Sequence, residues 1–203
     1  MKAKSITVKT GTLVDATINA AATEHDADAK WVMHKGRKAE HGFKAHVGAD
    51  ADTALVEEVC VTPANINDGR AGPAALPDNP GEVFADSAYR GSHFNDAVRA
   101  KGGIARIAAT SVWGKDEVET LAKLDAYNRP IHGVRARIEK IFGTCKRSYG
   151  LRKIRWRGIA KAAMQIHLIF IAYNIKRAYN ILAQGSQNPL LDPTIGRQRA
   201  ITR

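Results

Sequence analysis

The stretch that most constrains the fold of this chain lies at residues 128–150, NRPIHGVRARIEKIFGTCKRSYG. Its apolar side chains recur with the period of an α-helix, about 100° per residue. One stripe of the expected helix carries Val134, Ile138, Ile141, Phe142 and Cys145. The neighbouring stripe carries His132, Arg135, Glu139 and Lys146. We expect Asn128 to cap the helix, Pro130 to lie in its first turn and the apolar stripe to face a core.

Glu139 is informative because it is the one acidic residue between Arg129 and Lys161, a segment with eleven Lys or Arg residues. A lone carboxylate in so basic a helix suggests a ligand for a divalent metal ion on a surface that binds phosphate. An ion pair with Arg135 at i, i+4, worth roughly a few tenths of a kcal/mol, would explain the same residue. The helix by itself leaves both interpretations open.

The charge of the chain is unevenly placed. Residues 1–128 hold 15 basic and 18 acidic residues, a net charge of −3, whereas residues 129–203 hold 16 basic and 2 acidic residues, a net charge of +14. Such asymmetry favours a polyanionic partner, with nucleic acid ahead of an anionic membrane. The most apolar run, 166–172, contains a histidine and is too short to span a bilayer, so we expect no membrane segment.

The two cysteines, Cys60 and Cys145, are far apart and show no CxxC spacing. This usage suits a reduced cytoplasmic compartment and argues against a disulfide scaffold or a zinc ribbon. The N-terminal residues lack the apolar core of a signal peptide. We therefore expect a cytoplasmic protein.

Alternating and continuous apolar runs indicate an α/β fold. We expect strands at 13–18, 81–85 and 104–109, a hairpin formed by 42–50 and 54–62, and helices within 68–76 and at 92–101, 128–150 and 159–184. This order predicts a mixed sheet with helices on its faces. Residues 1–184 would form one domain, and residues 185–203, rich in Gly, Ser, Pro and Gln, would be a disordered tail.

Two aspartates share an unusual context. Asp15 lies inside an apolar strand (LVDAT), and Asp86 ends another (VFADSAY). A carboxylate in such a position is costly to desolvate unless a cation pairs with it. Each could instead cap a following turn. Together with Glu139 they make three hard oxygen donors, the set that Mg²⁺ or Mn²⁺ prefers.

At these residues the chain resembles the DDE transposases of bacterial insertion sequences, of the type called insertion sequence four or five. The matching pieces are LVDATINAA, GFKAHVGAD, FADSAYRG and RARIEKIFGTCK, and they extend over most of the chain. The most specific one is a Tyr–Arg–Glu–Lys signature, which reads here His132-x2-Arg135-x3-Glu139-x6-Lys146. Three of its four positions match, and His stands where the family has Tyr.

The resemblance implies a ribonuclease-H-like fold, with a mixed sheet covered by helices on both faces. It also implies that Asp15, Asp86 and Glu139 are catalytic and together hold two Mg²⁺ or Mn²⁺ ions. These ions would serve DNA cleavage at the ends of an insertion sequence and strand transfer into target DNA. His132, Arg135 and Lys146 would contact DNA phosphates, and Arg155 and Arg157 of the basic connector are further candidates for DNA binding.

The resemblance implies partners as well: the terminal inverted repeats, the target DNA and further copies of the chain, in a bacterial cytoplasm and at the nucleoid. Family members usually carry a helical DNA-binding region ahead of the first acid, whereas fourteen residues precede Asp15. We therefore expect a chain lacking that region, with a separate N-terminal polypeptide as one way to supply it. Two alternatives stay open: a nuclease that cuts without joining, and a catalytically idle DNA-binding remnant.

Overall fold

The expected strands assemble into one mixed sheet in the computed structural model, which describes residues 9–33, 36 and 38–186. The strands are β1 (Gly11–Ala20), β2 (Lys30–Val32), β3 (Glu40–Asp50), β4 (Val56–Pro63), β5 (Glu82–Ala85) and β6 (Ile104–Ile107). Within the described residues the sheet has six strands, in the order β2-β3-β1-β5-β6, with β4 pairing to β3 as well. The hairpin predicted from the two apolar runs is confirmed as β3 and β4.

The centre of the sheet is where its two halves meet. β1 pairs antiparallel with β3 on one side and parallel with β5 on the other, and β5 pairs parallel with β6. In the β1–β5 ladder Gly11 lies opposite Glu82 and Leu13 lies opposite Phe84. Two residues further along this register, Asp15 comes beside Asp86. Neighbouring strands lie about 4.8 Å apart, so the ladder alone brings the two carboxylates together.

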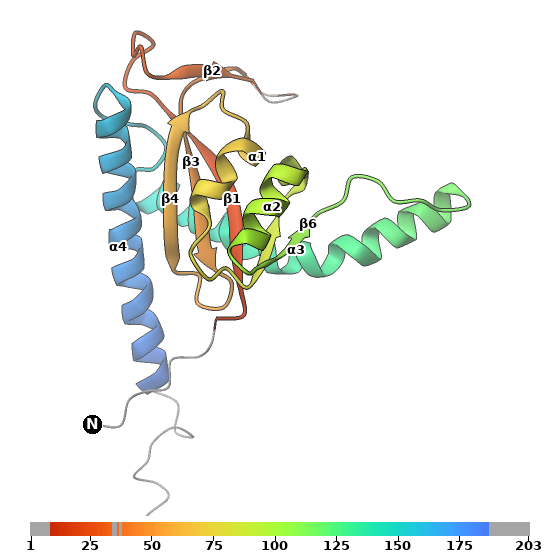
Figure 1. Ribbon diagram of the computed structural model, residues 1–203. Coiled ribbons are helices and arrows are strands. Elements are labelled where there is room, and N and C mark those ends of the chain that lie inside the picture. Colours follow the sequence, from red (N-terminus) through yellow and green to blue (C-terminus); the bar gives the residue numbers. More distant parts are fainter. Residues whose placement is uncertain (1–8, 34–35, 37, 187–203) are drawn as a thin grey trace, which may run out of the picture.

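Helices cover both faces of the sheet (Figure 1). They are α1 (Asp68–Ala71), α2 (Ser92–Ala100), α3 (Glu117–Ser148) and α4 (Ile159–Ser186), with short 3₁₀ turns η1 (Gly72–Ala75) and η2 (Ser87–Tyr89). Successive side chains of a strand point to opposite faces. Leu13 accordingly joins the core under α3 and α4, whereas Val14 joins the core under η1 and α2. The predicted α/β sheet with helices on both faces is confirmed.

The start of α3 differs from the prediction. The helix begins at Glu117, and Asp116 caps it by accepting a hydrogen bond from the Glu119 backbone N–H at 2.8 Å. Asn128 and Pro130 therefore lie inside the helix. The Asn128 side chain instead bonds both backbone groups of Ala109, at 2.8 and 2.9 Å. The first turns of α3 project away from the sheet (Figure 1) and are largely exposed, so they show no apolar stripe that sequence could reveal.

Smaller differences concern element ends. The strand β2 was not expected, and the cap of α2 is Gly91 rather than Ser92. The helix α4 continues to Ser186, past the domain boundary expected at residue 184. The remainder of the predicted tail lies outside the described residues. None of the helices in the described part of the chain is long and apolar enough to cross a membrane.

Candidate active site

Asp15 and Asp86 meet at one guanidinium. The Nη2 of Arg135, from α3, lies 3.1 Å from the Asp15 Oδ2 and 4.0 Å from the Asp86 Oδ2. Arg135 follows Asp15 by 120 positions in the chain and Asp86 by 49 positions. β1, β5 and α3 thus each contribute one charged group to the same point. This is the arrangement that a pair of buried carboxylates requires, because a cation offsets their desolvation.

Asp15 is the more enclosed of the two acids, with 18% of its side chain exposed. Its Oδ1 accepts a hydrogen bond from the Ala16 backbone N–H at 2.8 Å. Burial raises the pKa of the Asp15 carboxyl to about 6, against the lowering effects of Arg135 and of the Ala16 N–H; the charge of Asp86 raises it further. At neutral pH Asp15 is therefore mainly ionised, although burial disfavours its charged form. An added cation would stabilise the carboxylate.

Asp86 is the open side of the pair. Its Oδ1 caps η2 by accepting from the Ala88 backbone N–H at 2.9 Å, as the sequence context suggested. Its side chain is 37% exposed, about twice the exposed fraction of Asp15. A ligand can approach the two aspartates from this side.

Glu139 lies on α3 one turn beyond Arg135, with its side chain exposed. No ion pair joins Arg135 to Glu139 in the described part of the chain, since the guanidinium turns to the aspartates instead. The explanation of Glu139 as the partner of Arg135 is therefore not what the structure shows. Among residues 9–33, 36 and 38–186, however, no three His, Cys, Asp or Glu side chains are arranged to hold a metal ion.

The chemistry of the donor set fits a divalent cation at the aspartate pair. Two hard carboxylates already converge on one positive group, and burial, with the charge of Asp86, raises the pKa of Asp15 despite Arg135. Glu139 is on the helix that supplies Arg135 but does not join the pair in this arrangement. Its role as the third ligand stays a prediction.

Sequence reasoning missed a buried polar group on β3, beside the start of α1. Lys44 is 5% exposed, and its Nζ lies 2.8 Å from both the Ile66 carbonyl oxygen and the Asp68 Oδ1. His46, fully buried, places its Nδ1 3.9 Å from the same Asp68 oxygen. Burial lowers the pKa of His46 to about 4, so its imidazole is neutral at pH 7. Both side chains interleave with the apolar positions of β3, and this alternation was the signal available in the sequence.

Tyr89 is the second overlooked residue. It is fully buried on Phe94, with ring centroids 5.0 Å apart, and its hydroxyl has no hydrogen-bond partner among the described residues. Burial raises the pKa of Tyr89, and the charges of Asp15, Asp68 and Asp86 raise it further. The phenol therefore keeps its proton at neutral pH.

The predicted DNA-binding residues lie in two places. Lys146, partly buried on α3, lines a cavity of about 400 Å³ with Lys44, Asp68 and the β1 residues that directly follow Asp15. His132 is exposed on the same helix, one turn before Arg135. Arg135 itself is occupied by the aspartates.

Arg155 and Arg157 are exposed on the connector between α3 and α4. The connector backbone is held in place: the Ile154 N–H donates to the Ala20 carbonyl at 2.8 Å, and the Gly158 N–H donates to the Asp26 carboxylate at 2.9 Å. The two guanidiniums are thus presented from a fixed loop beside the end of β1. The structure brings this loop next to the strand of Asp15 although 140 residues separate Asp15 from Arg155.

These features agree with a comparison to protein families. A family model described as a transposase DDE domain matches residues 6–175, a range that includes Asp15, Asp86 and Glu139. No solved structure matches the chain. Because the family model spans most of the sequence and its range contains the paired aspartates, the chain belongs to the transposase DDE domain family.

Proposed function

We propose that this chain is a transposase of the insertion-sequence type, which cleaves DNA at the element ends in a reaction dependent on divalent metal and transfers the cut strand to target DNA. The observation that carries the proposal is the convergence of Asp15 and Asp86 on one cation, fixed by the β1–β5 register. Asp15, Asp86 and, as a predicted third ligand, Glu139 would hold the metal. The family generally uses divalent metal ions, which supports this assignment.

The reaction is displacement at phosphorus in two steps. Water first breaks the bond between the element end and the flanking strand, which leaves a 3′-hydroxyl. That hydroxyl then attacks a phosphodiester of the target and displaces its 3′-oxygen. Divalent ions would supply activation of the attacking oxygen and stabilisation of the leaving oxygen. The residues of this chain hold the donors in place: Arg135 offsets the charge of Asp15 and Asp86, and the backbone N–H groups of Ala16 and Ala88 fix their carboxylates.

DNA would approach from the exposed side of Asp86. We expect Lys146, on the cavity beside β1, and His132, on α3, to meet phosphates near the reacting bond. Arg155 and Arg157 would bind the backbone further along the duplex, from the connector. Contacts of this kind neutralise phosphates and carry affinity without reading sequence.

The decisive variant is Glu139→Gln, which keeps the shape of the side chain and removes its charge. If Glu139 is a ligand, DNA binding in Ca²⁺ should persist or tighten, because a negative charge has left a phosphate-binding surface. Cleavage of a terminal-repeat duplex in Mg²⁺ should fall by several orders of magnitude, since metal placement stabilises the transition state. Glu117→Gln, an exposed glutamate in the first turn of the same helix, is the matched control and should cleave like the parent.

Other outcomes separate the alternatives. Equal cleavage by the parent and Glu139→Gln would contradict the ligand role of Glu139. Cleavage by the parent without joined products, when target DNA is supplied, would indicate a nuclease. DNA binding by the parent without any cleavage in Mg²⁺ or Mn²⁺ would indicate the catalytically idle remnant.

A further inference from the structure

The long helix α4 has two apolar faces, of which the molecule uses one. The inner face packs on the sheet through Ala162, Ile166, Phe170 and Tyr173. It is also anchored by polar contacts, since the Asn174 side chain bonds the backbone of Val56 at 2.9 and 2.6 Å. These contacts fix the rotation of the helix about its own axis. The other face is therefore held outward.

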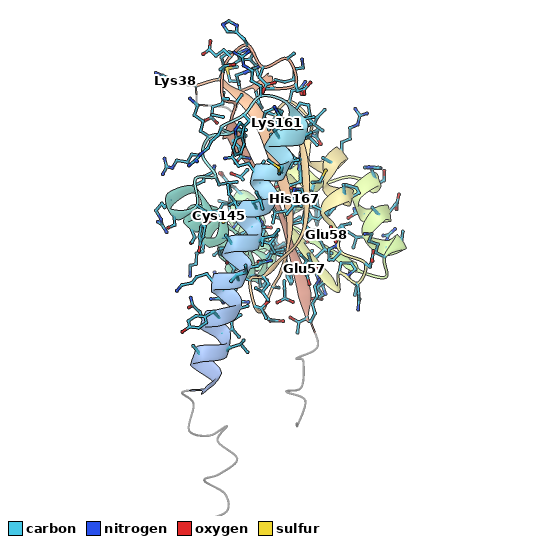
Figure 2. All side chains as sticks on the ribbon, turned by 90° about the vertical axis from the view of Figure 1, so that its left-hand side faces the viewer. Lys38, Glu57, Glu58, Cys145, Lys161 and His167 are labelled. Atoms are coloured by element: carbon cyan, nitrogen blue, oxygen red, sulfur yellow. The ribbon has the colours of Figure 1, made fainter. Side chains whose placement is uncertain are left out.

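The outward face carries a stripe of large apolar side chains, which we call the outer stripe. Its members and their exposed fractions are Met164 at 51%, Leu168 at 57%, Ile171 at 53%, Ile175 at 67% and Tyr179 at 64%. Figure 2 looks onto this side of the molecule and shows α4 lying across the front, with Lys161 and His167 labelled on it. A helix that is apolar on both faces is ordinarily covered on both.

The spacing of the outer stripe identifies what covers it. Its members follow one another at four, three, four and four residues, the spacing of a helix–helix seam. The stripe is also palindromic: about the midpoint of Ile171 and Ala172, Met164 mirrors Tyr179 and Leu168 mirrors Ile175. A second α4 laid antiparallel across the first would therefore place apolar side chain on apolar side chain along the whole stripe. We propose that the outer stripe is the contact between two copies of this chain, related by a two-fold axis near Ile171.

The apolar area of the stripe supports a self-association of moderate strength. Beside the stripe at the centre of α4 lies the uncharged Ala172, whereas the Lys176 ammonium lies 5.5 Å from the centre of the Tyr179 ring and places a positive charge at one end of the stripe. Next to Leu168 and Ala172 lies a groove of about 220 Å³, which Trp156 and Arg155 also line and which adds contact surface. Two stripes of five half-exposed apolar side chains, with their grooves, would bury on the order of 1,000 Å² in total. That area is near the lower limit of specific interfaces, about 1,000–1,200 Å².

The net charge of the chain sets how this contact depends on salt. Two copies of a chain with a formal net charge of +11 repel each other. Salt screens that repulsion but leaves the apolar contact in place, so association should strengthen as salt rises. Binding to DNA has the opposite dependence. The inference rests on α4 and does not require the proposed catalytic function.

The first test is the mass of the protein in solution, free of DNA and metal, by sedimentation equilibrium over a range of concentration and salt. The parent should form dimers, more strongly at 0.5 M than at 0.1 M salt. Ile175→Glu should weaken association by about 100-fold, because a symmetric dimer would contain the substituted residue in both copies. Ile104→Glu is the matched control, because Ile104 on β6 is 56% exposed and lies off the stripe. It should associate like the parent.

The second test fixes the orientation by disulfide cross-linking between copies. A mixture of Met164→Cys and Tyr179→Cys proteins should form a cross-linked heterodimer on oxidation, and Met164→Cys alone should form little. Cross-linking of Met164→Cys alone would overturn the antiparallel arrangement. A parent that is monomeric at all concentrations, or an Ile175→Glu variant that keeps the melting temperature of the parent and dimerises equally, would overturn the interface. Binding of the parent to lipid vesicles through the stripe, while the protein stays monomeric in solution, would also overturn the interface.

Discussion

At the scale of single residues, the electrostatics of this protein centre on Asp15. Two opposing effects act on its carboxyl: burial between β1 and α3 favours the neutral form, while the Arg135 guanidinium at 3.1 Å favours the charged form. Burial is the larger effect, and the pKa of Asp15 rises to about 6. The folded chain therefore holds on to the proton of Asp15 more tightly than the unfolded chain does. This difference has a direct consequence for stability.

We expect Asp15 to make the protein less stable as pH rises from about 4 to 6. The folded state binds more protons than the unfolded state in this window, so the free energy of unfolding falls with rising pH, by about 3 kcal/mol at most. His46, with its pKa lowered to about 4, acts in the opposite direction over the same range. The measurement is therefore a difference: urea unfolding of the parent and of Asp15→Asn at several pH values. The stability of the parent relative to the variant should fall from pH 4 to 6, and a constant difference would contradict the account.

Removing the buried hydroxyl of Tyr89 should affect the stability of the protein and its DNA cleavage in opposite directions. A buried polar group without a partner costs about 1–3 kcal/mol, so Tyr89→Phe should leave the melting temperature unchanged or raise it. Because the charges of Asp15 and Asp86 act on that hydroxyl, we expect the same variant to cleave DNA at least tenfold more slowly. Phe94→Tyr would be a poor control because it adds a hydroxyl to the core; Tyr127→Phe, at an exposed tyrosine, is the suitable one. A Tyr89→Phe variant that is less stable and fully active would refute this view.

At the scale of elements, Asn128 tethers the projecting first turns of α3 to the segment after β6, beside a second hydrogen bond that the Tyr127 hydroxyl donates to the Ile107 carbonyl at 3.3 Å. The Asn128 side chain bonds the backbone N–H and carbonyl of Ala109, just after β6. Asn128→Ala leaves both groups without their partner, and the loss should be about 1–3 kcal/mol of unfolding free energy. Amide hydrogen exchange should rise in residues 109–128. Lys123→Ala, on the exposed part of the same helix, should change neither quantity appreciably, and equal effects of the two variants would argue against the tether.

The same residue shows where sequence reasoning stops. Asn128 followed by Pro130 is a good signal for a helix start. The local sequence does not reveal that the Asn128 side chain bonds Ala109, which lies 19 residues away. The preceding helical turns are exposed, so they lack the apolar period that defined the rest of α3. The strands β1, β3, β4 and β5, by contrast, were predictable because each buries an apolar run in the sheet.

The candidate site also has parts that the sequence reveals and parts that only the folded structure reveals. Asp15 and Asp86 could be singled out from the sequence, because a carboxylate in or at the end of an apolar strand is costly to desolvate. Their meeting follows from the β1–β5 register, which is a property of the sheet and not of either segment. The turn of Arg135 away from Glu139 and toward Asp15 was not predictable, because helical spacing favours the local partner and the distant one is 120 residues away.

At the scale of the whole molecule, the sheet carries the acids and the C-terminal third carries the positive charge. Residues 129–203 have a formal net charge of +14, and Arg155 and Arg157 are exposed on the connector beside the end of β1. Binding of DNA should therefore weaken steeply with salt. The double variant Arg155→Gln, Arg157→Gln should flatten the slope of log affinity against log salt by up to about two units.

The matched control for the connector is the double variant Arg99→Gln, Lys123→Gln, which removes two exposed positive charges from the other part of the chain. It should leave the salt slope close to that of the parent. If both double variants flatten the slope equally, the connector has no special place on DNA and only net charge matters.

The central claim is that Asp15 and Asp86 together form a site for divalent metal, and Mn²⁺ binding tests it most directly. Binding can be followed by electron paramagnetic resonance, without DNA and without knowledge of the terminal repeat. The parent should bind Mn²⁺ at pH 7.5 and more weakly at pH 5, where Asp15 takes up its proton. Asp15→Asn and Asp86→Asn should each weaken binding at least tenfold, whereas Asp96→Asn, an exposed aspartate on α2, should not. Unchanged Mn²⁺ binding in both site variants would contradict the claim.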